Sequence, residues 1–247
     1  ATVFSQGVSA VLCYGYMMRR FDILRGTPDE RKFNGDLARR LMYIGVPMGL
    51  QFSITAIGSI MLQSANNALG TACVAAFTAA MRIKMFFMCP LESLGIAMAT
   101  YTGQNYGAKD EGRCKKIFRL GMLCSVISCG ILSTIFVVFR TFFIGLFTSD
   151  PSVYHYAQLR FLIVLTFECL TSSYEISGGC LRGFGRSMTP AILTVFGSCV
   201  LRLIWLATVC NWFHDYKLLM AIYPISWVLT GTMVLVAYFR TRKKLFL

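Results

Sequence analysis

The chain has 247 residues, of which 56% are hydrophobic and only 14% charged. Soluble domains usually carry about a quarter charged residues, so this composition excludes an ordinary water-soluble enzyme and a disordered chain, and it indicates a membrane protein. The 24 Lys and Arg residues against 11 Asp and Glu give a net charge of +13. Whether that charge signals a nucleic-acid partner depends on where the basic residues lie.

Seven segments are long and apolar enough to cross a membrane as helices, which takes about 20 residues each. They run approximately over 1–18, 38–66, 71–102, 118–145, 153–180, 187–211 and 218–240. The uncharged stretch 41–81 is too long for one crossing, and its Asn-Asn-Ala-Leu-Gly segment at 66–70 predicts a turn. The predicted fold class is therefore all-α, a polytopic membrane helix bundle.

Three helix starts carry capping signals. Thr-Pro-Asp-Glu at 27–30 predicts a short surface helix between the first two spans. Asp-Pro at 150–151 and Thr-Pro at 189–190 predict the starts of the fifth and sixth spans.

Basic residues alternate between the two sides of the predicted bundle. The connections 19–40, 103–119, 182–186 and 240–247 carry seven, five, two and four Lys or Arg residues, whereas 66–71, 146–152 and 212–217 carry zero, zero and one. By the positive-inside rule the first group of connections and the C-terminus lie on the cytoplasmic side. We expect the protein to reside in the cell membrane. Most of the positive charge then faces membrane lipids, and we expect no nucleic-acid partner.

The cysteine and histidine residues are not spaced as metal ligands. Nine of the ten cysteines lie in apolar stretches, Cys114 lies in a basic loop, and no two form a CxxC pair. We expect reduced cysteines that pack as small hydrophobic residues. His155 and His214 cannot build a metal site alone, so we expect neither a metal nor a cofactor.

The second span carries a polar stripe. A polar side chain recurs at every fourth residue, at Gln51, Thr55, Ser59, Gln63 and Asn67. This spacing puts all five on one helix face, which we expect to line a cavity or a helix contact. The alternative is a small-polar interface that joins neighbouring helices.

Charges also lie inside the third span. Lys84 and Glu92 fall on one helix face at multiples of four residues, with Arg82 on an adjacent face and Pro90 predicting a kink. Arg82 and Lys84 lie roughly 18 to 21 Å past Gly70 by helical rise, which is too deep for their charges to reach the interface easily.

The fifth span holds two acidic residues in one sector, Glu168 and Glu175, with Thr171 between them. Glu168 and Arg202 lie at similar depths counted from the cytoplasmic side, so we predict that they form an ion pair. Glu175 has no evident partner. That suits it to bind and release a proton or to attract a cationic substrate, with a hydrogen-bonded structural carboxyl as the alternative.

Several stretches resemble one transporter family. The run 90–108, PLESLGIAMATYTGQNYGA, is similar to the helix-end signature of the multidrug and toxic-compound extrusion (MATE) transporters, which centres on Gly-Gln-Asn-x-Gly-Ala. The stretches 150–157, 180–190, 201–205 and 223–227 resemble further landmarks of that family in the same order. The motif residues carried over are Gly103, Gln104, Asn105, Gly107, Leu181, Arg182 and Gly183.

The resemblance implies twelve helices in two pseudo-symmetric lobes around a central cavity, and a non-enzymatic antiporter that exports amphipathic cations in exchange for H⁺ or Na⁺. In that arrangement 1–18 is the last helix of the N-terminal lobe, 19–37 is the cytoplasmic linker, and 38–247 is the six-helix C-terminal lobe. The absent N-terminal lobe and a small amphipathic substrate are then the expected partners. Thr55 stands where some members carry an essential acidic residue.

We therefore predict a multidrug antiporter with a substrate and ion cavity. The expected cavity residues are Gln51, Thr55, Ser59, Gln63, Arg82, Lys84, Glu92, Glu168, Thr171, Glu175 and Arg202. One alternative is a lipid-linked-oligosaccharide flippase of related architecture, which needs a more cationic cavity; Arg82, Lys84 and Arg202 leave it open. The other is an intramembrane enzyme, which needs a clustered nucleophile and base or metal ligands.

Overall fold

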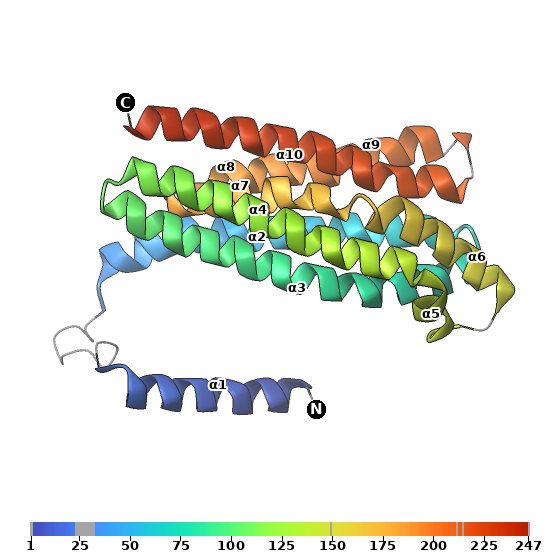
Figure 1. Ribbon diagram of the computed structural model, residues 1–247, viewed down its shortest axis with the longest axis horizontal. Coiled ribbons are helices and arrows are strands. Elements are labelled where there is room, and N and C mark those ends of the chain that lie inside the picture. The colour runs from blue at the N-terminus through green and yellow to red at the C-terminus, as the bar shows by residue number, and fades with distance from the viewer. Residues whose placement is uncertain (1, 23–32, 149, 211, 214, 247) are drawn as a thin grey trace. The chain divides into compact units, whose positions relative to one another are not determined.

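The computed structural model of the protein describes residues 2–22, 33–148, 150–210, 212–213 and 215–246. Within these ranges every regular element is helical (Figure 1), so the all-α prediction is confirmed. The chain divides into two compact units, Ala1–Met42 and Tyr43–Leu247. The first unit holds α1 (Thr2–Arg20) and the start of α2 (Gly35–Asn67). The helix predicted at 27–30 lies outside the described residues.

The predicted turn between the second and third spans is confirmed. Helix α2 ends at Asn67 and α3 (Thr71–Gly107) begins after a short turn. Gly70 in this turn has a φ of 107°, a backbone conformation that residues with a side chain rarely adopt. The glycine therefore allows the long uncharged stretch to fold back on itself.

Helix α3 bends where the sequence predicts a kink. The segments Thr71–Phe86 and Met88–Gly107 meet at an angle of 41°. Pro90 has no N–H to donate to the carbonyl of Phe86, four residues earlier, and its ring crowds that carbonyl. The bend therefore divides α3 into two straight pieces with different neighbours.

The fifth predicted span is a broken helix. Helix α6 (Pro151–Arg160) continues as a π-helical turn, Phe161–Leu165, and helical structure resumes at Glu168–Leu170 and α7 (Thr171–Gly183). The predicted start is confirmed, because the Asp150 carboxylate accepts a hydrogen bond from the Ser152 amide at 2.8 Å. Non-helical backbone at membrane depth is tolerated where protein surrounds it, and Glu168 at this break is fully buried.

The sixth span begins at the predicted place, but Thr189 lies inside the helix and does not cap it. Helix α8 (Met188–Thr194) already begins at Met188, with no side-chain cap from Ser187. Gly185, at a φ of 75°, closes α7 through a hydrogen bond from its amide to the Arg182 carbonyl at 2.9 Å. The chain turns so tightly there that it re-enters a helix before Thr189.

The remaining helices complete a membrane bundle. The predicted fourth span contains α4 (Glu111–Val138) and the short α5 (Arg140–Gly145). After α8, two π-helical turns flank α9 (Leu201–Trp205), and α10 (Tyr216–Phe246) ends the fold. Among the described residues, four helices are long and apolar enough to cross a membrane, Gly35–Asn67, Glu111–Val138, Met188–Val209 and Tyr216–Phe246, and the bent α3 makes a fifth. The broken fifth span misses this criterion because neither α6 nor α7 is long enough alone.

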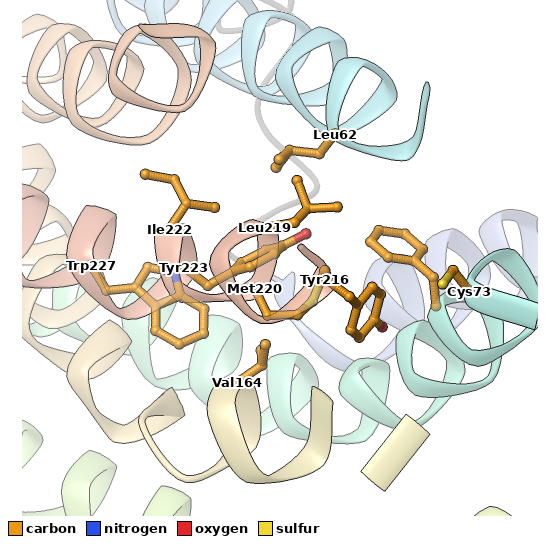
Figure 2. Packing of buried hydrophobic residues seen from close by; sticks show 10 residues of the cluster. Leu62, Cys73, Val164, Tyr216, Leu219, Met220, Ile222, Tyr223 and Trp227 are labelled. Atoms are coloured by element: carbon orange, nitrogen blue, oxygen red, sulfur yellow. The ribbon is translucent and has the colours of Figure 1, made fainter. Parts of the chain in front are cut away.

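Helix α7 packs against both α3 and α10, which lie on opposite sides of it in Figure 1. Helix α3 packs against α4, α6 and α7, and α10 packs against α7 and α8. One buried cluster gathers around the first half of α10, as Figure 2 shows, and includes Tyr216, Met220, Tyr223 and Trp227.

Small residues allow the backbones of α3 and α7 to touch. A Cβ atom on Gly183 would lie 2.6 Å from the carbonyl oxygen of Ala99, and one on Gly179 would overlap that of Gly95. Gly103 continues the four-residue spacing on α3, where an added Cβ would contact the Gly183 carbonyl oxygen at 3.4 Å. In lipid, helix association relies on such close packing because apolar burial gives little net force.

We expect Gly179→Ala to destabilise the protein, because its methyl group must push α7 away from the Gly95 carbonyl. Overpacking of this kind costs about 1–3 kcal/mol. Thermal unfolding in detergent, followed by tryptophan fluorescence, measures the loss. Gly130→Ala on α4 is the matched control, since nothing lies within 4 Å of its added Cβ. Equal unfolding midpoints for the two variants would contradict the close crossing.

Candidate functional site

A cavity of about 290 Å³ lies between α2, α3 and α7. Five of its lining residues have polar or charged side chains: Gln51, Glu92, Glu175, Arg182 and Thr100, whose hydroxyl donates to the Ile96 carbonyl. The rest of the wall is apolar, with Met48, Phe52, Gly95, Ile96 and Ala99. Two carboxylates and one guanidinium leave the wall with a net negative charge when all three are ionised. An apolar chamber with that charge is suited to an organic cation.

The contact between α3 and α7 also positions the acidic wall. Glu175 lies one helical turn before Gly179, and its Oε2 atom would be 3.6 Å from a Cβ on Gly95. Arg182 lies two turns after Glu175 on the same helix and donates from Nη2 to Oε1 of Gln51 at 3.3 Å. This hydrogen bond joins α7 to α2 across the cavity.

Only one residue of the predicted polar stripe on α2 lines this cavity. Gln51 is buried there, whereas Thr55 is half-buried and donates its hydroxyl to the Gln51 carbonyl at 2.8 Å. Ser59 donates to the Thr55 carbonyl, and both Ser59 and Gln63 are exposed. The hydroxyl groups of the stripe thus satisfy the backbone of their own helix.

A second group of charges lies away from the cavity. The Lys84 ammonium is 3.2 Å from a carboxylate oxygen of Glu168, whose side chain is 0% exposed. The predicted Glu168–Arg202 pair is therefore wrong. Arg202 instead donates to the hydroxyl of Ser226 at 3.3 Å.

Helix phase explains this error. Counting residues gives depth along a span but not rotation about its axis. The interruption before Glu168 and the π-helical turn Val195–Val200 before Arg202 both change that rotation. Lys84 on α3 therefore pairs with Glu168. Both residues were predicted to line the cavity, and neither does.

Aromatic rings hold the cations of this second group. The Lys84 ammonium lies 5.0 Å from the ring centre of Trp227 and 5.8 Å from that of Tyr223. The guanidinium of Arg202 lies 4.7 Å from the Tyr223 ring. Tyr223 and Trp227 belong to the α10 cluster drawn in Figure 2. Such cation–π contacts are worth about 2 kcal/mol or more when the cation is desolvated.

Arg160 belongs to the same group and was missed from the sequence. It is 2% exposed, and its guanidinium carbon lies 3.9 Å from the ring centre of Phe77 and 5.3 Å from that of Tyr223. A basic residue inside the predicted span 153–180 was the available signal. Arg182 was counted as part of a cytoplasmic connection, although the last turn of α7 places it in the cavity wall.

The other predicted residues are structural or exposed. Arg82 is exposed on α3, and Thr171 is buried with its hydroxyl donating to the Glu168 carbonyl. Among the motif residues, Leu181 is buried, Gln104 and Gly107 are exposed, and Asn105 donates from Nδ2 to the Tyr101 carbonyl at 2.8 Å. Within the described residues, no three His, Cys, Asp or Glu side chains gather as metal ligands.

The family model MatE matches residues 47–208, which include the cavity and most of the buried charge group. The chain belongs to the MatE family. It is therefore a multi-pass membrane protein, as its apolar helices also indicate. The family resemblance predicted from the sequence motifs is confirmed.

Two curated relatives of this MatE chain are named for drug resistance. "Probable multidrug resistance protein YoeA" of Bacillus subtilis is 24% identical over 199 residues, covering 79% of this chain and 43% of the relative. "Probable multidrug resistance protein NorM" of Acinetobacter baylyi is 27% identical over 187 residues, covering 74% and 40%. The chain spans less than half the length of these relatives.

Solved MATE transporters share the fold. An outward-facing multidrug resistance MATE family transporter of the MOP superfamily matches with a TM-score of 0.88 and 17% identity, over 99% of this chain and 55% of its own. The Vibrio cholerae MATE transporter VcmN in its bent form matches with a TM-score of 0.84 and 17% identity, over the same shares. The agreement confirms the membrane helix bundle predicted from the sequence.

We expect Lys84→Gln and Glu168→Gln each to destabilise this MatE fold strongly. Removing one partner of a buried ion pair leaves an uncompensated charge and costs about 3–5 kcal/mol. The double variant should lose less than the sum of the single variants. Unfolding in mixed detergent micelles gives the three free energies and their coupling.

The exposed pair of Lys115 and Glu111, with 2.8 Å between its charged atoms, is the matched control for this double-mutant cycle. Its coupling should stay at about 0–1 kcal/mol, as for most surface pairs. Additive losses at Lys84 and Glu168 would show that the two charges do not stabilise each other.

Proposed function

We propose that this chain forms one lobe of a secondary active antiporter that exports amphipathic cationic compounds in exchange for H⁺ or Na⁺. The observation that carries the proposal is the cavity between α2, α3 and α7, where Glu92 and Glu175 lie in a largely apolar wall. Membership of the MatE family and the names of the two multidrug resistance relatives support it. The rest of the transporter supplies the facing wall in this proposal.

In this proposal the substrate and the coupling ion compete for the same carboxylates. A substrate ammonium group and a coupling proton or Na⁺ both neutralise Glu175 or Glu92, so each disfavours binding of the other. The two lobes can open the cavity to either side of the membrane. A cation with a higher affinity for one of these two states shifts the population toward that state, by an amount set by the ratio of its two affinities. Gln51 and Arg182 are held by their mutual hydrogen bond and keep the polar wall in place during the exchange.

The charge of the cavity favours this proposal over a flippase for lipid-linked pyrophosphate. Such a substrate requires a cationic wall, and Arg182 is the basic residue in the described lining, against two carboxylates. Arg82 is exposed elsewhere, and Lys84 and Arg202 are engaged in the buried aromatic group. For an intramembrane enzyme, the described lining offers Glu92 and Glu175 as bases but no serine, cysteine or histidine as a nucleophile beside them.

We also propose a cell-membrane location with the C-terminus in the cytoplasm. Support comes from the basic residues that follow α3, α7 and the apolar part of α10, compared with the nearly uncharged turns at the opposite ends. Accessibility of a single cysteine placed at Lys243 to a membrane-impermeant reagent tests this orientation.

Glu175→Gln should abolish most of the efflux of a cationic dye from cells that express the full-length transporter. Loss of the negative charge removes attraction for both the substrate and the coupling ion, so we expect a decrease of about tenfold or more, equivalent to ~1.4 kcal/mol. Glu111→Gln, at an exposed surface pair, is the matched control and should leave efflux unchanged. Unchanged efflux with unchanged ion dependence in Glu175→Gln would remove this residue from the mechanism.

Purified full-length transporter in vesicles separates the two kinds of substrate. We expect movement of the cationic dye and no movement of a lipid-linked pyrophosphate, because the latter meets the carboxylates of Glu92 and Glu175. Glu92→Gln should weaken dye transport in the same assay. Pyrophosphate movement that survives both glutamate substitutions would favour the flippase.

A further inference from the structure

A groove of about 540 Å³ runs between α8 and the second half of α10, away from the cavity described above. Its wall is mostly apolar along one part and basic at the end nearer the C-terminus. The residues that carry the argument are Leu193, Leu229, Met233, Val236, Arg240 and Lys244.

The α10 residues of the groove form one continuous helix face. Positions 229, 233, 236, 240 and 244 recur at intervals of three or four residues, which aligns their side chains. From Leu229 to Arg240 the helix rises roughly 16 Å. One leaflet contributes about half of the ~30 Å hydrocarbon core of a bilayer. The apolar part of the groove is therefore about as long as the acyl region of one leaflet.

The basic end of the groove carries positive charge that its own wall does not neutralise. Arg240 and Lys244 are exposed one turn apart, and no carboxylate occurs among the described residues that line the groove. The neighbouring Arg242 differs, because its guanidinium lies 5.4 Å from the Phe239 ring centre and 5.8 Å from that of Tyr238. Two free cations at the headgroup level are complementary to a phosphate group.

We propose that this groove is a binding site for one anionic phospholipid. Its phosphate lies between Arg240 and Lys244, and an acyl chain runs from there between Val236 and Leu193 on α8 and on along Met233 and Leu229. The bound lipid then contacts both α8 and α10 and links the two helices at their basic end. This site is independent of the substrate cavity and of the exchange mechanism.

Native mass spectrometry of the full-length protein in detergent tests the site with two probes of identical acyl chains, phosphatidylglycerol and phosphatidylcholine. We expect preferential retention of one phosphatidylglycerol. Two basic residues near an anionic headgroup are together worth about 30-fold in affinity. Arg240→Gln/Lys244→Gln should remove this preference.

The control Lys243→Gln/Arg119→Gln removes the same charge from exposed positions outside the groove and should retain the lipid. Val236→Trp fills the apolar wall without changing charge and should also reduce retention, with the thermal unfolding midpoint confirming that each variant is folded. Equal retention of the two lipids, or equal loss in the charge control, would overturn the proposal. So would a cross-link from a cysteine at Val236 to another part of the protein or to a second copy, since the groove would then be covered by protein.

Discussion

The contact between α3 and α7 fixes the positions of Glu92, Glu175 and Arg182 in the candidate cavity. Glycines at 179 and 183 let α7 lie directly against the carbonyl groups of Gly95 and Ala99. In a lipid environment this dense backbone packing replaces the hydrophobic force that holds helices together in water. Once the crossing is set, Glu175 faces α3 and Arg182 reaches Gln51 on α2. The motif glycines Gly103 and Gly183 belong to this close contact between the two helices.

Charges are costly in the low dielectric of the bundle, and its two groups of charges differ in what surrounds them. Glu168 is fully buried, and its carboxylate is matched by Lys84, whose ammonium also lies over the rings of Trp227 and Tyr223. Arg160 and Arg202 rest on aromatic faces as well. Lys84 and Glu168 thus compensate each other, and the two guanidinium groups lie on aromatic rings that belong to the fold. Glu175 and Glu92 instead border open volume, where an exchangeable cation can compensate them.

Sequence patterns predicted the elements of this fold better than the contacts between them. Apolar length and turn residues placed the helices, including the reversal at Gly70 and the start of α6 after Asp150, because these signals are local. The Glu168–Arg202 pairing failed because it depends on helix rotation. The π-helical turns and the break that set this rotation have no strong residue signal in a single sequence. In the polar stripe, periodicity identified the face of α2 correctly at Gln51, but the face becomes exposed at Ser59 and Gln63.

The bend in α3 explains why Lys84 and Glu92 have different partners despite lying on one face of an ideal helix. Lys84 precedes the bend and joins Glu168, which directly follows the interruption between α6 and α7. Glu92 follows the bend, in the piece of α3 that contacts α7 through Gly95, Ala99 and Gly103. The cavity is therefore built from α2, the part of α3 after its bend, and α7 after the break. The aromatic charge group is built from the part of α3 before its bend, from α6 and Glu168, and from α9 and α10. Two interruptions, one in each of two neighbouring spans, thus separate the charges that pair inside the bundle from those that border the cavity.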